Sequence, residues 1–149
     1  MKPSSSTFCA FLIACALALW LAAAAPAMCD APARLALEPS APGVVVGQEL
    51  TLTVRVAEVT DLYGLDLRLT FDPALLEVVD VDPAKEGVQS LAGEYPYPEL
   101  VARNEADNAA GTLWYMVTQL GARAPVSGDG TIVTARLRAL APGEATIGV

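Results

Sequence analysis

The stretch Tyr63–Pro83, with the sequence YGLDLRLTFDPALLEVVDVDP, predicts two β-strands joined by a turn. Apolar and polar side chains alternate strictly through residues 65–71, and a period of two is typical of a strand with one buried face. The Asp72-Pro73 pair ends this strand, because proline lacks the amide that a β-ladder needs and aspartate favours turns. A β-branched run centred on Val79 follows, so we expect a second strand there.

Further strands are expected on both sides of this stretch. Short alternating runs lie at Arg34–Glu38, Glu49–Val56, Leu100–Arg103, Thr112–Leu120, Thr131–Leu140 and Ala145–Val149. Asn104–Gly111 is predicted to be a polar turn, and Gly121–Gly130 a loop. About eight short strands and no helical period predict an all-β fold, an antiparallel two-sheet β-sandwich with jelly-roll topology. Its last strand is expected to be truncated at Val149.

The first residues have the features of a secretory signal. Lys2 gives a positive start, the uninterrupted apolar run Phe8–Ala25 follows, and small residues come after it. We therefore predict a signal peptide at residues 1–27, a linker at 28–32 and the folded domain at 33–149. The run is long for a signal peptide, so an uncleaved amino-terminal anchor is the alternative. Either interpretation places the domain outside the cytoplasm, secreted or at the cell surface.

The cysteines and the charge restrict how the domain is held together and what it binds. All three cysteines, Cys9, Cys15 and Cys29, lie in or beside the leader, so the domain must be stabilised by burial without a disulfide framework. Without Lys2, eight basic residues stand against seventeen acidic ones, a net charge of about −9. This disfavours nucleic acid and anionic membranes as partners. The acidity serves solubility or, alternatively, a basic partner or calcium-rich surroundings.

Four pieces of the sequence occur in an order that resembles a known family. They are Gly47 before the strand Leu50–Val56, the approach Val59–Gly64, the pair Leu67–Pro73 and Leu75–Val79, and the closing Gly128–Ala135 followed by Pro142-Gly143. Together they resemble the cohesin family, sandwich modules that receive dockerin domains in bacterial polysaccharide-degrading assemblies. The resemblance covers about Ala33 to Val149.

The resemblance implies where a partner would bind. In the family, a dockerin lies on one flat sheet face and contacts polar residues of the strand before the Asp-Pro turn. Asp66 matches the contacting aspartate, beside Arg68, whereas Gly64 stands where the family has an asparagine. Met116 and Gln119 fall at positions of the neighbouring strand that would face the partner. Asp66 alternatively belongs to an ordinary solvated sheet face.

Aromatic residues suggest a second interpretation, a carbohydrate-binding module. Tyr95 and Tyr97, which flank a proline, and Trp114 have rings that can stack on sugars. Packing of the tyrosine loop over the end of the sandwich is the simpler role. Trp114 and Met116 are either exposed, forming an apolar patch for a protein partner, or covered by that loop, and burial is favoured for Trp114.

Catalytic chemistry finds little support in the sequence. The chain contains no histidine and the predicted domain no cysteine, which excludes sites built on those residues. A carboxylate pair for glycoside hydrolysis would have to come from Glu77, Asp80 and Asp82, which are better explained as a solvated edge. No catalytic or metal residues and no cofactor are therefore predicted. A weak alternative is structural calcium at Asn104, Glu105, Asp107 and Asn108, whose spacing is not that of an EF-hand.

These observations predict a secreted, non-catalytic, cohesin-like module that binds a dockerin-type domain. A carbohydrate-binding module that takes polysaccharide and a structural sandwich of a surface protein remain alternatives, and a glycosidase is a weaker one.

Overall fold

The computed structural model describes residues 32–149, so the predicted leader and almost all of the predicted linker lie outside the described residues. Within residues 32–149, no helix is long and apolar enough to cross a membrane. This part of the chain contains eight strands, namely β1 (Arg34–Pro39), β2 (Glu49–Leu62), β3 (Gly64–Thr70), β4 (Leu76–Val79), β5 (Leu91–Ala92), β6 (Leu100–Asp107), β7 (Thr112–Thr118) and β8 (Val126–Ala139).

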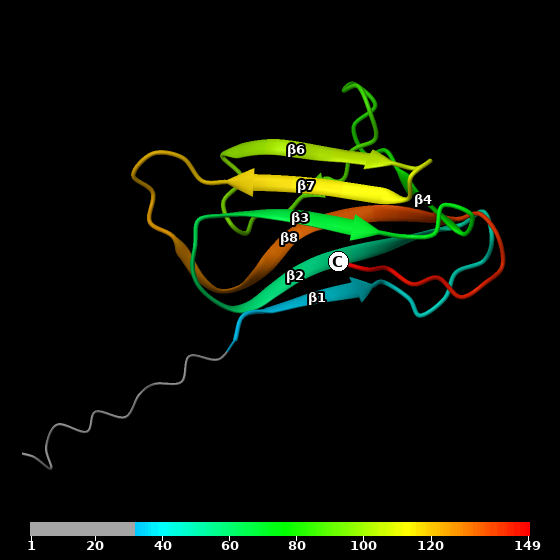
Figure 1. Ribbon diagram of the computed structural model, residues 1–149, viewed down its shortest axis with the longest axis horizontal. Helices are drawn as coiled ribbons and strands as arrows, with labels where there is room; N and C mark the ends of the chain where they lie inside the picture. Colours follow the sequence, from blue (N-terminus) through cyan, green and yellow to red (C-terminus); the bar gives the residue numbers. More distant parts are fainter. Residues whose placement is uncertain (1–31) are drawn as a thin grey trace, which may run out of the picture. The chain divides into compact units, whose positions relative to one another are not determined.

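The strands form two facing antiparallel sheets (Figure 1). The first has the order β1-β2-β8-β4, with β5 also paired to β8, and the second has the order β3-β7-β6. The predicted jelly-roll sandwich is thereby confirmed. The core between the sheets is aliphatic except for Tyr115 and Phe71.

The stretch Tyr63–Pro83 carries the chain from one sheet to the other. Its alternation is confirmed, because Leu67 and Leu69 are buried while the neighbouring Asp66, Arg68 and Thr70 are exposed. The turn is fixed by Asp72, whose carboxylate accepts a hydrogen bond from the Ala74 amide at 2.9 Å. The Asp72 carbonyl also accepts from the Leu75 and Leu76 amides. This connection places β3 and β4 in opposite sheets, with their apolar faces toward each other.

Strands β2 and β8 are longer than predicted because their pairing continues through bulges at the polar residues where turns were expected. The β2–β8 register shifts between Val56 and Val59 and again before Leu62, and Glu58 and Asp61 have positive φ angles of 57° and 54°. Two side chains of β8 accept hydrogen bonds from the backbone amides at these positions. The Asp129 carboxylate accepts from the Glu58 amide at 2.8 Å, and the Ser127 hydroxyl accepts from the Asp61 amide at 3.0 Å. The polar residues that indicated turns therefore stabilise bulges.

Other boundaries also differ from the prediction, including the short strand β5, which lies where a loop was expected. Residues 104–107, expected in a turn, belong to β6, because this strand continues along β7 as far as Thr112. Residues 126–130, expected in a loop, begin β8. The segment Ala145–Val149 forms an isolated antiparallel bridge between Gly148 and Thr70 in place of a strand.

Tyr115 lies at the centre of the core, on the inward face of β7. It is fully buried, and its hydroxyl has no hydrogen-bond partner among the described residues. Burial raises the pKa of Tyr115 from 10.0 to about 12, since the phenolate loses its hydration in an apolar interior.

This pKa predicts an alkaline loss of stability. The unfolded chain releases the Tyr115 proton near pH 10 and the folded chain only near pH 12, so the free energy of unfolding should fall as pH rises through that window. We expect the Tyr115 contribution to the fall between pH 9 and pH 11 to be about 1.3 kcal/mol, because at pH 11 the unfolded group is largely ionised while the folded group is still protonated. Urea titrations at pH 9 and pH 11 would measure the fall, with Tyr115→Phe as the control. An equal fall in both proteins would contradict the prediction.

Candidate partner-binding face

The outward face of β3, β7 and β6 carries the polar and aromatic residues that the sequence singled out. Its centre consists of Asp66 and Arg68 from β3, Trp114 and Met116 from β7, and Arg103 and Glu105 from β6. We call this set the β3–β7–β6 face. Antiparallel pairing sets Arg68 opposite Trp114 and Asp66 opposite Met116. Opposed residues of paired strands project to the same side, so these side chains form one surface.

Arg103 and Glu105 reach this face because of a bulge in β6. The register of β6 on β7 shifts between Val101, opposite Val117, and Arg103, opposite Met116. Val101 is partly buried on the inner side, and without the shift Arg103 would share its side. The sequence gives no sign of this bulge, so these two residues were not predicted to face a partner.

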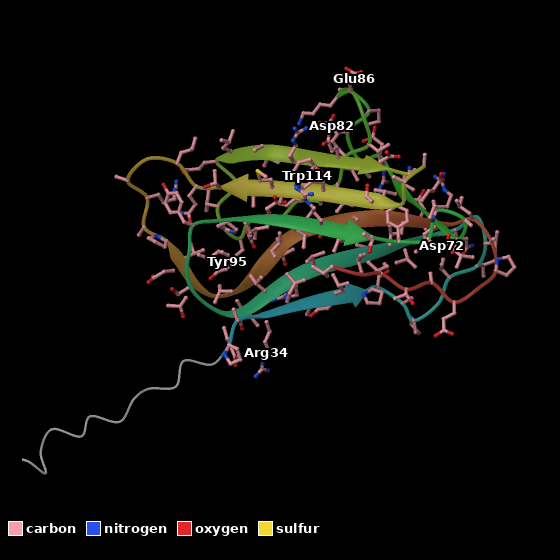
Figure 2. The ribbon with its side chains drawn as sticks, viewed as in Figure 1. Arg34, Asp72, Asp82, Glu86, Tyr95 and Trp114 are labelled. Carbon is pink, nitrogen blue, oxygen red and sulfur yellow. The ribbon has the colours of Figure 1, made fainter. Side chains whose placement is uncertain are left out.

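Trp114 lies on β7 (Figure 2), the middle strand of its sheet, and side chains of both neighbouring strands contact it. Its indole Nε1 donates a 2.6 Å hydrogen bond to Asp66 Oδ1. The guanidinium carbons of Arg68 and Arg103 lie 4.2 Å and 4.7 Å from the ring centroid. Each arginine also pairs with an acid, Arg68 with Asp66 at 3.7 Å and Arg103 with Glu105 at 3.1 Å.

The burial predicted for Trp114 under the tyrosine loop is therefore wrong, because the ring lies on the outer side of its sheet and is partly exposed. Individual exposed ion pairs and cation–π contacts are weak. Here several of them act on one ring from two strands, so the indole is fixed in a single orientation.

Gly64 and Gln119 differ from the rest of the predicted set. A Cβ on Gly64 would lie 2.8 Å from Thr118 Oγ1 and 2.9 Å from the Val117 carbonyl oxygen, so the glycine reflects a close approach of β3 and β7. Gln119 was expected to face a partner, but it is buried, and its side-chain amide donates to the Ala124 carbonyl at 3.0 Å. It follows directly after β7 and continues the odd-numbered, inward side that Tyr115 and Val117 occupy in that strand, so that part of the prediction is wrong.

The three aromatic residues proposed for sugar binding have different surroundings. Tyr95 packs against Gly130 of β8, where a Cβ would lie 2.1 Å from the tyrosine Cγ. Burial raises the pKa of the Tyr95 hydroxyl, helped by the charge of Asp129. Tyr97 is 55% exposed, and the Arg123 guanidinium carbon lies 4.5 Å from its ring centroid. Trp114 lies on the outer face of the other sheet (Figure 2).

The acidic and amide residues considered for calcium each make separate contacts with the protein. The Asn104 side chain accepts from the Ser90 amide at 2.9 Å and donates to the Ser90 carbonyl at 2.7 Å. Asn108 makes the same pair of bonds to Val78, at 2.7 Å and 2.9 Å. Asp107 accepts from two amides of the following turn. Among the described residues, no three acidic, histidine or cysteine side chains are grouped as a metal site.

The carboxylates considered for hydrolysis also have structural contacts. Asp80 accepts hydrogen bonds from the amides of Asp82 and Gln89, which lower the pKa of its carboxyl group. Glu77 bonds to Arg138 at 2.7 Å. These residues hold the β4–β5 loop and the first sheet together.

Comparison with known proteins places this geometry in a family. The family model described as the cohesin domain matches residues 37–148. The chain belongs to the cohesin family. A search of curated proteins found no match to this cohesin domain.

Solved structures of cohesins share the fold. A type II cohesin domain from the cellulosome of Acetivibrio cellulolyticus is 19% identical, with a TM-score of 0.65 over 78% of this chain and 74% of that one. Type II cohesin A11 from Bacteroides cellulosolvens is 15% identical, with a TM-score of 0.62 over 76% of each chain. A structure of a type II cohesin–X-dockerin complex from A. cellulolyticus is 16% identical, with a TM-score of 0.61 over 78% of this chain and 76% of that chain.

The contact of Tyr95 with Gly130 predicts a stability effect. Gly130→Ala should lower the free energy of unfolding by about 1–3 kcal/mol, because the new methyl group cannot fit beside the ring without displacing it. The matched control is Gly43→Ala, where a Cβ has nothing within 4 Å. Urea denaturation would measure both. Equal stability of the two variants would contradict the packing described for Tyr95.

Proposed function

We propose that this cohesin domain is a secreted, non-catalytic module that binds a dockerin-type protein domain through the β3–β7–β6 face. Cohesin domains are interaction modules, and one similar solved structure is a complex of a type II cohesin with an X-dockerin partner. The leader predicted at residues 1–27 supports an extracellular or cell-surface location. An assembly that degrades polysaccharides is the proposed setting.

The observation that carries the proposal is the fixed orientation of Trp114. Tryptophan, arginine and methionine are enriched in the energetically important centres of protein interfaces. A ring that is already held by Asp66, Arg68 and Arg103 loses little side-chain entropy when a partner covers it. Met116 lies beside it and adds an adaptable apolar contact.

Specificity would come from the charges around the indole. Two arginines and two acids alternate on this face, so a partner has to match a pattern of both signs. The family resemblance implies an asparagine two residues before Asp66, but this chain has Gly64 there and therefore lacks that side chain. The partner therefore meets a half-buried glycine at that end of β3, and we propose a dockerin-type surface that differs from those suited to an asparagine there.

A direct carbohydrate-binding function receives less support from the geometry. Sugar platforms need aromatic rings that lie together, whereas Tyr95 is packed against Gly130 and Tyr97 is occupied by Arg123. Affinity electrophoresis in polysaccharide gels tests this function, and strong retardation would count in its favour.

Calorimetric titration against dockerin domains from the same genome, with calcium present for the dockerin, tests the proposal. We expect saturable binding that soluble glycans do not compete. Absence of binding to every such dockerin would overturn the proposal.

Replacing Trp114 by alanine should weaken dockerin binding by roughly 30-fold or more, since truncation of a central interface aromatic costs about 2 kcal/mol. Tyr97→Ala is the matched control, because it also removes an exposed ring but lies outside this face. Isothermal titration calorimetry gives both dissociation constants. Equal affinities for the two variants would place the binding site elsewhere.

Asp66 allows charge and hydrogen bonding to be separated. Asp66→Asn keeps an oxygen that can accept the Trp114 Nε1 hydrogen bond, whereas Asp66→Arg reverses the charge and removes the acceptor. We expect a small loss of affinity for the first variant and at least a tenfold loss for the second. Surface plasmon resonance at two salt concentrations would measure both. Unchanged binding by Asp66→Arg would exclude this part of the face.

A further inference from the structure

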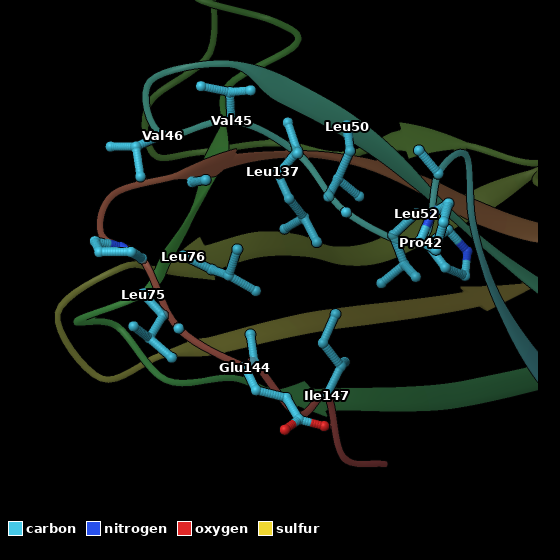
Figure 3. Close-up of a pocket in the computed structure, with 18 of the residues that line it drawn as sticks. Pro42, Val45, Val46, Leu50, Leu52, Leu75, Leu76, Leu137, Glu144 and Ile147 are labelled. Atoms are coloured by element: carbon cyan, nitrogen blue, oxygen red, sulfur yellow. The ribbon is translucent and has the colours of Figure 1, made fainter.

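The middle of the first sheet carries small, polar and charged side chains on its outer face. Leu50, Leu52 and Leu137 point to the inner side of β2 and β8, where they line an apolar groove (Figure 3). Side chains alternate along a strand, so the neighbours of these leucines point outward. We call the outward residues in the middle of this sheet the β1–β2–β8 face. They are Ala36 and Glu38 of β1, Thr51, Thr53 and Arg55 of β2, and Thr134 of β8. Apart from the two charged residues these side chains are small, so another surface can approach closely.

Arg55 differs from the other cations of this acidic domain. Without Lys2, the chain has eight lysine and arginine residues, and seven of these eight lie within 4.0 Å of a carboxylate oxygen. Arg55 is the exception, and within residues 32–149 its side chain also has no hydrogen bond or ring contact. It is half-buried, and an arginine that is partly removed from water favours a carboxylate partner. The structure therefore leaves Arg55 available for an acid of another molecule.

Glu38 is the matching acid on the same face. It is exposed and lies opposite Thr53, which makes it the diagonal neighbour of Arg55 across β1 and β2. Its carboxylate has no ion pair within residues 32–149. Diagonal neighbours on paired strands are about 7–8 Å apart, so the two charges lie close together, yet they do not pair with each other. One small area thus presents both an acid and a base to a partner.

A second copy of the chain satisfies both charges at once. In a two-fold symmetric contact both copies use the same surface, so every contact between two residues also forms in reverse. With the two-fold axis between Arg55 and Glu38, each Arg55 meets the Glu38 of the other copy, which gives two ion pairs. Ala36 and Thr53 lie between the charges and near the axis, where small side chains allow two sheets to pack about 10 Å apart. The negative charge of each copy opposes association, so the contact is weak and the ion pairs determine its orientation.

We propose that the β1–β2–β8 face is a self-association site, at which two copies of this domain pack face to face through reciprocal ion pairs between Arg55 and Glu38. The dockerin-type interaction is proposed for the outer face of the other sheet, so a pair of domains leaves both of its partner-binding faces exposed. Two partners are then held on opposite sides of one assembly. The self-association does not depend on whether a dockerin binds.

Sedimentation velocity of the native chain and of charge variants tests the proposal. We expect the native chain to pass from monomer to dimer between about 10 μM and about 1 mM, the range of a weak contact. Arg55→Glu sets acids against acids, and Glu38→Arg sets bases against bases, so each variant should associate at least roughly tenfold more weakly. The double variant Arg55→Glu/Glu38→Arg exchanges the two charges. Its dissociation constant should return to within about threefold of the native value, because the two positions act as a pair.

The matched control is Lys85→Glu, which changes the net charge by the same amount as Arg55→Glu but lies in the exposed loop after β4. It should associate like the native chain. Near-ultraviolet circular dichroism checks that every variant is folded. A native chain that stays monomeric throughout, or a double variant that associates as weakly as either single variant, would overturn the proposal. Equal association of all these proteins would also overturn it, because the contact would then lie in another part of the chain.

Discussion

The register of β3 on β7 is the constraint on which the rest of this structure depends. Each residue from Gly64 to Thr70 lies directly opposite one residue of β7, without interruption. This arrangement keeps Leu67 against the core beside Tyr115, and it brings Asp66 to the indole of Trp114 on the outside. A slip of one residue would exchange the two faces, exposing the leucines and burying the charges. The same pairing thus determines both the core and the candidate binding face.

The parts of the fold that follow a period of two could be predicted from the sequence. Alternation in residues 65–71 and 112–118 gave the strands and their inward residues, and the Asp72-Pro73 pair gave the turn. The bulges of β2 could not be predicted, because the hydrogen bonds that stabilise them come from residues far away in the sequence. Asp129 and Ser127 accept amides at Glu58 and Asp61, so residues that favour turns locally are kept in a strand by β8.

The candidate site was predicted in part, for the same reason. Asp66, Arg68 and Met116 follow from alternation, and the structure places all three on one face. Gln119 was misplaced because the resemblance was followed where alternation predicted an inward side chain. Arg103 was missed because one bulge in β6 changes the direction of its side chain. A glycine fits position 64 because the backbone of β7 lies too close for a Cβ atom. This close approach cannot be seen in the sequence.

Asn104 and Asn108 have a consequence for how this domain can change over evolution. Each asparagine pairs with both backbone groups of one distant residue, Ser90 or Val78, as a neighbouring strand would. These bonds reach main-chain atoms, so they do not depend on which side chains the attached segments carry. The side chains of the segment next to Ser90 can therefore change while that segment stays attached through its main chain, whereas Asp80 and Tyr95 of the same excursion between β4 and β6 are held by contacts of their own side chains. The asparagines themselves are constrained, because a carboxylate at either position would place a negative oxygen against a carbonyl.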